Sequence, residues 1–127
     1  MTAKASTTTM HIGELADRTG LSLRTIRHYD EVGLLPATAR TDGGFRVYTE
    51  DDFERLMVIK AMKPLGFSLE EMAEILSILA TPDSQAPSSG TAGRLAEFLA
   101  RAVNERAKMA RNLAQADEFI EGLGGHS

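Results

Sequence analysis

The feature that most restricts the fold is a pair of short helical segments separated by a tight turn. Residues 12–19 carry apolar side chains at helical spacing, and Gly20 ends that segment. Ser22 is a good N-cap for a second helix, because its hydroxyl can accept a hydrogen bond from an otherwise unpaired backbone N–H. Gly33 stands where this second helix should stop. The chain must therefore place two short helices at an angle to each other.

The second helix has one apolar and one basic face. Leu23 and Ile26 can point inward, which turns Arg24, Arg27 and His28 outward. A basic face of this kind suits the phosphates and base edges of a nucleic acid.

A turn and a short strand follow. Pro36 prevents the helix from continuing, residues 41–44 (Thr-Asp-Gly-Gly) are typical of a turn, and residues 45–48 alternate like a strand. A helix, a glycine turn, a capped helix and a hairpin together have the spacing of a winged helix-turn-helix. A helical hairpin that only packs is the other interpretation. Arginines on both the helix and the hairpin favour DNA binding.

Residues 12–76 resemble the DNA-binding domain of the MerR family of bacterial transcription regulators. Four segments carry the resemblance in order: IGELA, TIRHYDEVGLL, GFRVY and LGFSLEEM. The resemblance implies a homodimer that binds a two-fold symmetric promoter operator. It also implies bending and untwisting of the promoter spacer, so that RNA polymerase meets its two recognition elements in line.

Composition narrows the function further. The net charge is −4, yet residues 18–48 hold five arginines against three acids, so the acidity lies mainly in the C-terminal half. The chain has no cysteine, and its three histidines are scattered, which excludes thiolate metal sites and argues against zinc. No pairing of nucleophile and base is evident, so we expect neither an enzyme nor a cofactor. No apolar run could span a membrane, and we expect a cytoplasmic, nucleoid-associated protein.

Two further helices are marked by their caps. Thr49 and Asp52 form a capping box with a short acid, and Pro64 should end or bend the helix that follows. Ser68 and Glu71 form a second capping box, from which a fourth helix runs to about residue 79.

The C-terminal region carries an apolar repeat at steps of four and three residues. Eight of the nine positions are apolar, Arg106 being the exception, and the length predicts a helix of about 40 Å. A stripe this long needs a partner, and a second copy of the chain is the simplest one. Folding back on its own domain is the alternative. The seam consists of Leu95, Leu99, Ala102, Arg106, Met109, Leu113, Ala116, Ile120 and Leu123. Phe98 and Phe119 lie beside it and either pack or line an effector pocket.

The predicted fold is therefore mainly α: a winged helix-turn-helix of about four helices with a small β-hairpin, plus a long coiled-coil helix. The expected segments are a disordered tail (1–9), the DNA-binding domain (10–80), a linker (81–93), the dimerisation helix (94–123) and a flexible end (124–127). No large effector domain is expected.

The predicted DNA contacts divide between the grooves and the phosphate backbone. Three side chains of the second helix are predicted to contact the major groove: Arg24, Thr25 and Arg27. His28 and Tyr29 come next, and the imidazole or the tyrosine hydroxyl could meet a phosphate. Ser22, at the cap, is a further predicted DNA contact. Tyr29 could instead be half-buried core. Four residues are predicted to hold the backbone: Arg18, Arg40, Arg46 and Tyr48. The resemblance implies that residues 60–68 act as a second wing, which adds Lys60 and Lys63 as DNA contacts; a solvated helix edge is the alternative for these two lysines. The arginines on either side of the wing turn are hard to explain by folding alone.

The sequence leaves the signal open. The alternatives are a small apolar effector, a partner protein, or no signal at all. Two other functions remain possible: an excisionase-like architectural DNA binder, and a coiled-coil adaptor for other proteins.

Overall fold

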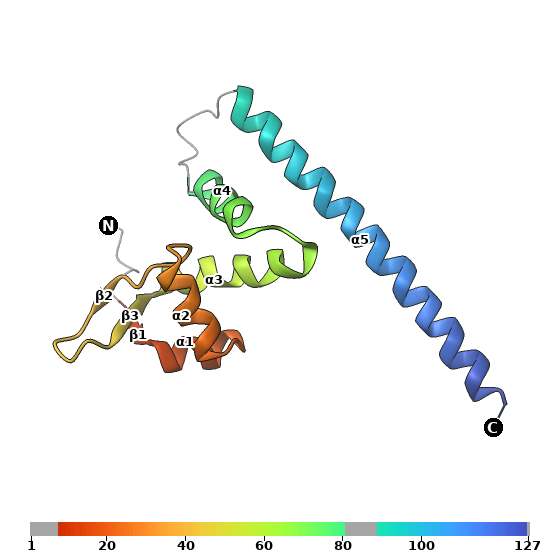
Figure 1. The fold of residues 1–127 in the computed structure, drawn as a ribbon, viewed down its shortest axis with the longest axis horizontal. Coiled ribbons are helices and arrows are strands. Elements are labelled where there is room, and N and C mark those ends of the chain that lie inside the picture. The colour runs from red at the N-terminus through yellow and green to blue at the C-terminus, as the bar shows by residue number, and fades with distance from the viewer. Residues whose placement is uncertain (1–7, 81–88, 127) are drawn as a thin grey trace. The chain divides into compact units, whose positions relative to one another are not determined.

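The computed structural model describes residues 8–80 and 89–126. The chain divides after Leu76 into two compact units, which we describe separately. The elements, labelled in Figure 1, are β1 (Thr9–His11), α1 (Ile12–Thr19), α2 (Leu23–Glu31), β2 (Ala39–Arg40), β3 (Arg46–Thr49), α3 (Glu50–Met62), the 3-10 helix η2 (Lys63–Leu65), α4 (Leu69–Leu79) and α5 (Ser89–Gly124). The mainly helical fold with a small sheet is as predicted.

The helix-turn-helix is built from the expected caps. Gly20 takes a left-handed φ of 76° and its N–H donates to the carbonyl of Ala16, which ends α1. The Oγ of Ser22 accepts from the N–H of Thr25 at 3.1 Å, which starts α2. Leu23 was predicted to face inward with Ile26, but it is 38% exposed, whereas Ile26 is fully buried. The first turn of α2 therefore lies at the surface.

The sheet has three strands rather than a simple hairpin. Its order is β1-β3-β2 and both pairings are antiparallel. Thr9, assigned from the sequence to a disordered tail, begins β1 and pairs with Thr49. The neighbouring pair, Met10 and Tyr48, is buried, and burial of this cross-strand pair explains why residues 9–11 form a strand. Residues 1–7 of the predicted tail lie outside the described residues.

The connection from α3 to α4 follows the predicted stop and start signals. Thr49 and Asp52 form the capping box of α3, which ends at Met62. Pro64 lies in η2, and Gly66 closes the turn with a φ of 87°. The N–H of Ser68 then donates to the Glu71 carboxylate at 2.9 Å, and the N–H of Glu71 donates back to the Ser68 hydroxyl at 3.1 Å.

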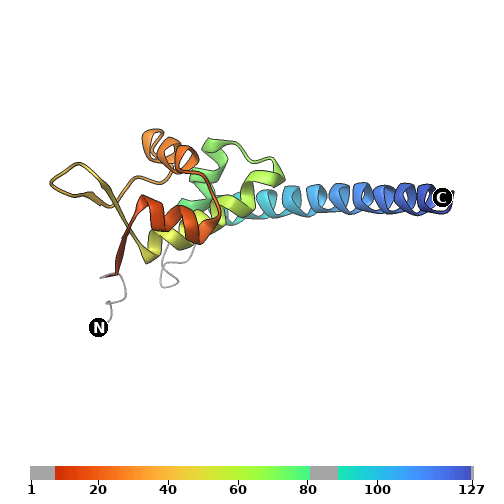
Figure 2. The same ribbon diagram turned by 90° about the horizontal axis from the view of Figure 1, so that it is seen from below.

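The core of the first unit is small and apolar. The side chains that anchor it are less than 2% exposed and come from α1, α2, the loop after α2, β3, α3 and α4: Leu15, Ile26, Leu35, Tyr48, Leu56, Ile59 and Met72. Within this unit, α1 contacts both α2 and α3. The β2–β3 hairpin projects beyond the helices of this unit in both ribbon views (Figures 1 and 2).

The helix α5 is longer than predicted. It begins at Ser89, so residues 89–93, assigned from the sequence to the linker, are helical. Gly90 and Gly93 suggested a linker, but each costs only about 1 kcal/mol in a helix, and the 36-residue helix of which they are part offsets that cost. Residues 81–88 of the predicted linker lie outside the described residues.

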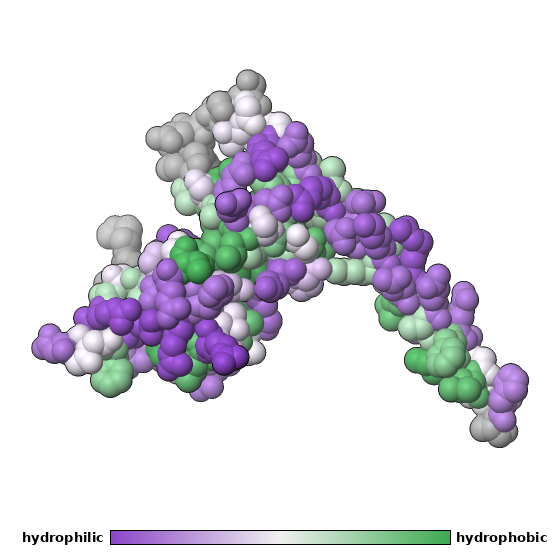
Figure 3. All heavy atoms as spheres, viewed as in Figure 1, coloured by the Kyte–Doolittle hydropathy of each residue, from purple (hydrophilic) through white to green (hydrophobic). Residues whose placement is uncertain are grey.

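The large apolar side chains of the seam on α5 are exposed in the single chain. Leu99, Leu113, Ile120 and Leu123 are each more than 60% exposed. Figure 3 shows hydrophobic atoms gathered near the C-terminal end of α5. The two phenylalanines beside the seam differ: Phe98 is 3% exposed, with the Arg94 guanidinium 4.4 Å from its ring centre, whereas Phe119 is 68% exposed.

Candidate nucleic-acid interface

The outer face of α2 is basic and open to solvent. Arg24, Arg27 and His28 are exposed, as the sequence predicted. The hydroxyl of Ser22 donates to Thr25 Oγ1 at 2.9 Å, so both side chains are tied to the start of the helix. The base-reading candidates therefore stand on a helix whose first turn is fixed.

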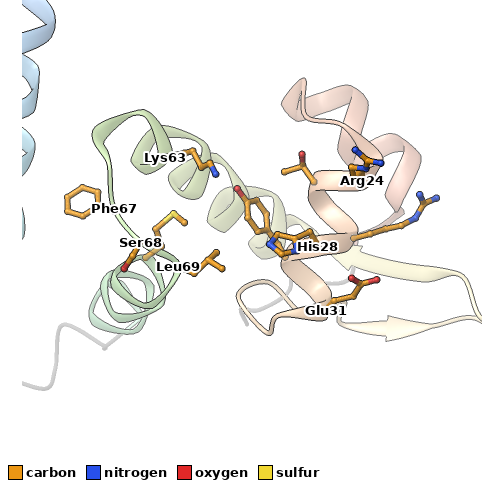
Figure 4. Close-up of a pocket in the computed structure, with 11 residues that line it drawn as sticks. Arg24, His28, Glu31, Lys63, Phe67, Ser68 and Leu69 are labelled. Carbon is orange, nitrogen blue, oxygen red and sulfur yellow. The ribbon is translucent and has the colours of Figure 1, made fainter.

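A groove of about 720 Å³ runs along this face. The helix α2 forms one wall, and the turn from η2 into α4 forms the other, as Figure 4 shows. Eleven residues line the groove: Arg24, Thr25, Arg27, His28, Tyr29, Glu31, Lys63, Phe67, Ser68, Leu69 and Met72. Six of the predicted DNA-contacting residues thus meet in one groove, namely Arg24, Thr25, Arg27, His28, Tyr29 and Lys63. Glu31 is the one acid among the lining residues.

Tyr29 belongs both to the groove and to the core. It is 4% exposed, and burial raises the pKa of its hydroxyl. Its ring centre lies 5.9 Å from that of His28. Tyr29 therefore packs in the core, which is the alternative that the sequence had left open. Only the part of its ring that faces the groove is placed to contact DNA.

Asp30 organises this face of the protein in a way that the sequence did not predict. Its carboxylate accepts from Arg46 Nε at 2.6 Å, from an Arg40 guanidinium nitrogen at 3.3 Å and from the N–H of Ala37 at 3.1 Å. Asp30 is on α2 and the two arginines are on β3 and β2, so one carboxylate joins the helix to the wing. The sequence shows Asp30 only as one acid in a segment rich in arginine. Its ion pair with Arg46 joins residues 16 positions apart, and no local pattern predicts such a contact.

The charge of Asp30 is stabilised in the folded chain. Burial acts to raise the pKa of its carboxyl, but the hydrogen bonds from Arg46 and Ala37 and the nearby arginine charges outweigh it, and the pKa lies below its usual value. The pairing with Asp30 therefore gives Arg46 a role in the fold, and it gives Arg40 part of such a role. From the sequence, the arginines on either side of the wing turn had been hard to explain by folding alone. The side chain of Arg46 is 17% exposed and that of Arg40 is 52% exposed, so Arg40 keeps more freedom to meet a phosphate.

Two other predicted DNA contacts are also engaged within the protein. Arg18 pairs with Glu50 at 2.5 Å, and its guanidinium lies 4.1 Å from the centre of the Phe53 ring. The hydrogen bond and charge of Arg18 lower the pKa of the Glu50 carboxyl. Lys60 Nζ donates to the carbonyl of Thr19 at 2.6 Å and so satisfies the C-terminal end of α1. Both residues have structural roles that the sequence did not reveal.

Tyr48 is not positioned to contact DNA. It is fully buried in the central strand, and its hydroxyl has no hydrogen-bond partner among residues 8–80 and 89–126. Burial raises the pKa of this hydroxyl. The prediction that Tyr48 holds the phosphate backbone is therefore wrong. The alternation of residues 45–48 does not say which face of the strand is buried. In the structure, β3 pairs with β1, and Tyr48 lies on the buried face opposite Met10.

Other kinds of site are not evident where the structure is described. In residues 8–80 and 89–126, no group of three or more His, Cys, Asp or Glu side chains is placed to hold a metal ion. Over the same residues, no helix combines the length and the apolarity needed to cross a bilayer.

Comparison with known proteins decides the family. The family described as "MerR HTH family regulatory protein" matches residues 10–78, and the family described as "MerR, DNA binding" matches residues 53–118. The chain belongs to the MerR family. Two independent features agree with this membership, namely the basic groove along α2 and the long α5.

Two curated relatives are described as HTH-type transcriptional regulators. The HTH-type transcriptional regulator ZntR of Escherichia coli is 39% identical over 114 residues, which is 87% of this chain and 80% of ZntR. The HTH-type transcriptional regulator YfmP of Bacillus subtilis is 53% identical over 68 residues, 53% of this chain and 49% of YfmP. The chain spans about half the length of YfmP, and 30% of the Nodulation protein NolA of Bradyrhizobium elkanii.

Solved structures have the same fold. HiNmlR, described as a MerR family regulator lacking the sensor domain and bound to promoter DNA, is 26% identical with a TM-score of 0.67, over 92% of this chain and 89% of HiNmlR. A MerR family regulator from Bacillus cereus is 30% identical with a TM-score of 0.59, over 91% of this chain and 82% of that protein.

Proposed function

We propose that this MerR-family chain is a sequence-specific transcriptional regulator that binds promoter DNA as a homodimer. The observation that carries the proposal is the groove beside α2, because it gathers the exposed cationic side chains of a capped, rigid helix. The relative HiNmlR, which was solved with promoter DNA, supports the same function. Such a regulator acts in the cytoplasm, at the nucleoid.

The geometry supports different roles for the basic residues. Arg24 and Arg27, together with Thr25 and His28, face the major groove, where an arginine fork matches the O6 and N7 atoms of guanine. Lys63, on the opposite wall of the groove, holds the phosphate backbone of the strand that lies between the walls.

A second set of basic residues acts mainly through the fold. Arg46 orients the wing through Asp30, Lys60 secures the end of α1, and Arg18 joins α1 to the start of α3. Arg40 combines both roles, since half of its side chain remains exposed.

The dimer is proposed from the apolar seam of α5. A 36-residue helix has a length of about 54 Å. Pairing two such helices would bury the large apolar side chains now exposed along the seam, and it would fix the separation of the two α2 helices on the duplex. Binding would then bend and untwist the promoter spacer and change its use by RNA polymerase. An apolar small molecule beside Phe98 or Phe119 is one way in which a signal could act.

The test uses the full chain and the DNA upstream of its own gene. A gel shift at two salt concentrations should give a discrete complex that survives competitor DNA and weakens steeply as salt rises. Permanganate reactivity at the promoter spacer should increase in the complex. A discrete complex without spacer distortion would indicate an architectural DNA binder. Absence of any salt-dependent complex with this DNA or a randomised pool would indicate an adaptor and would refute the proposal.

A further inference from the structure

The last turn of α2 carries an acid that both strands of the wing share. One carboxylate oxygen of Asp30 accepts from Arg46 Nε, on β3, at 2.6 Å and from a guanidinium nitrogen of Arg40, on β2, at 3.3 Å. Its other oxygen accepts from the N–H of Ala37 at 3.1 Å, and the side chain is 13% exposed. A single carboxylate therefore fixes the cations of both wing strands relative to the helix that is proposed to read bases.

The two arginines are held to different degrees. Arg46 makes the shorter bond to Asp30, and its side chain is 17% exposed. Arg40 makes the longer bond, its side chain is 52% exposed, and it also donates to the carbonyl of Gly44 at 3.1 Å. Exposed ion pairs contribute little to stability, because both charges stay close to water. A DNA phosphate can therefore replace Asp30 as the partner of Arg40, while Arg46 keeps the wing attached to the helix.

The attachment to α2 changes what a phosphate contact by Arg40 reports. Contacts with phosphate are independent of base sequence and supply most of non-specific binding. A wing arginine with full rotational freedom would reach a phosphate on any stretch of DNA. An arginine that is held beside α2 has a phosphate within reach only at one depth and register of α2 in the major groove. Correct base contacts select that position, so the restraint makes a sequence-independent contact conditional on sequence.

We propose that Asp30 is a specificity-determining residue, which ties the wing arginines to α2 so that Arg40 binds phosphate only when α2 is seated on its preferred sequence. The inference rests on the proposed DNA-binding function and deepens it. Asp30 is a positioning residue, because it acts through the two arginines and not through a contact of its own with DNA. On other sequences Arg40 stays paired within the protein, and the carboxylate beside it opposes the approach of a phosphate.

Glu31 offers a matched control. It is the next residue on α2, is acidic and exposed, and lines the groove beside α2 (Figure 4). Both acids act on Arg46: its hydrogen bond to Asp30 is the main cause that raises the pKa of the Arg46 guanidinium, and the charge of Glu31 raises it further. In the part of the chain that the structure describes, the carboxylate paired with both wing arginines is that of Asp30. Asp30→Asn and Glu31→Gln each remove one negative charge, but only Asp30→Asn frees the arginines.

The experiment measures the affinity of the full chain for a duplex that the wild type selects from a randomised pool, and for a shuffled duplex of the same composition. Asp30→Asn should bind the shuffled duplex about 3-fold to 10-fold tighter, and the dependence of log K on log salt should steepen by about one phosphate contact. Its affinity for the selected duplex should change by less than about 2-fold, because Arg40 already makes that contact there. Glu31→Gln should strengthen binding to both duplexes by the same factor and keep the discrimination between them.

A second variant tests the same link without removing the buried carboxylate. Arg40→Gln keeps the pair between Asp30 and Arg46, and it should weaken binding to the selected duplex about 3-fold to 10-fold while changing binding to the shuffled duplex by less than about 2-fold. The folded fraction of each variant is measured by circular dichroism under the binding conditions. Partial unfolding of Asp30→Asn lowers both affinities by the same factor, so it leaves their ratio unchanged.

Three outcomes decide the matter. Equal discrimination by Asp30→Asn and Glu31→Gln would overturn this inference and leave the DNA-binding function intact. Equal weakening of both duplexes by Arg40→Gln would do the same, because it would show that Arg40 binds phosphate whatever the sequence. Failure of the wild type to select any duplex would overturn the proposed function and this inference with it.

Discussion

Replacing Asp30 with alanine should destabilise the first unit strongly. The carboxylate is 13% exposed and accepts three hydrogen bonds, two of them from arginines. Without it, Arg46 at 17% exposure loses its counter-charge. A hydrogen bond to a charged group contributes about 1.5–3 kcal/mol, and breaking a fully buried pair costs about 3–5 kcal/mol. Because both groups retain some contact with water, we expect a loss of about 2–4 kcal/mol.

The assay is urea unfolding followed by circular dichroism, with the free energy of unfolding taken from the linear extrapolation. Glu31→Ala is the matched control, because Glu31 is the next residue on α2, is acidic and is exposed. It should change the unfolding free energy by less than about 0.5 kcal/mol. A double-mutant cycle with Arg46→Met should give a coupling energy of at least about 1 kcal/mol between Asp30 and Arg46.

A loss below about 1 kcal/mol for Asp30→Ala, together with additive effects of the two substitutions, would refute this reasoning. It would mean that the carboxylate does not join the helix to the wing in solution.

Three more predictions follow from buried or paired groups. The pKa of Asp30 is lower in the folded chain than in the unfolded chain. The stability that the ionised carboxylate contributes is therefore complete above about pH 4 and is lost as the pH falls through the folded pKa. Asp30→Asn should lack this part of the loss of stability when unfolding is followed in acid. Tyr48→Phe removes a buried hydroxyl that has no partner in the described part of the chain, and it should raise the unfolding free energy by about 1 kcal/mol; a loss of that size in urea unfolding would show that the hydroxyl is hydrogen-bonded. Lys60→Met should cost about 1 kcal/mol of stability through the lost bond to Thr19. It should leave the salt slope of DNA binding unchanged, and a reduced slope would instead show a phosphate contact.

Local signals in the sequence predicted the elements well. The caps at Ser22, Thr49 and Ser68 were all confirmed, as was the end of α3 before Pro64. Each of these depends on residues within four positions, so the sequence contains the whole interaction. The exposed basic face of α2 was predicted for the same reason, because helical spacing alone turns Arg24, Arg27 and His28 outward. The second wall of the groove comes from η2 and α4, and helical spacing within α2 could not predict it.

Contacts between distant segments were not predictable in this way. Asp30 meets Arg46 from 16 residues away, and Lys60 reaches Thr19 from 41 residues away. An arginine or lysine looks the same in the sequence whether it binds a DNA phosphate or an oxygen atom of its own chain. The burial of Tyr48 depends on a third strand, β1, whose first residue, Thr9, was assigned from the sequence to a disordered tail.

The most direct measurement is the preference of the wild type and of Arg24→Ala for a selected duplex over a shuffled duplex of the same composition. If α2 reads base edges, Arg24→Ala should lose about 1–3 kcal/mol of discrimination, and binding to the shuffled duplex should change little. If Arg24→Ala weakens binding to both duplexes equally, or changes neither, the basic face of α2 does not read sequence.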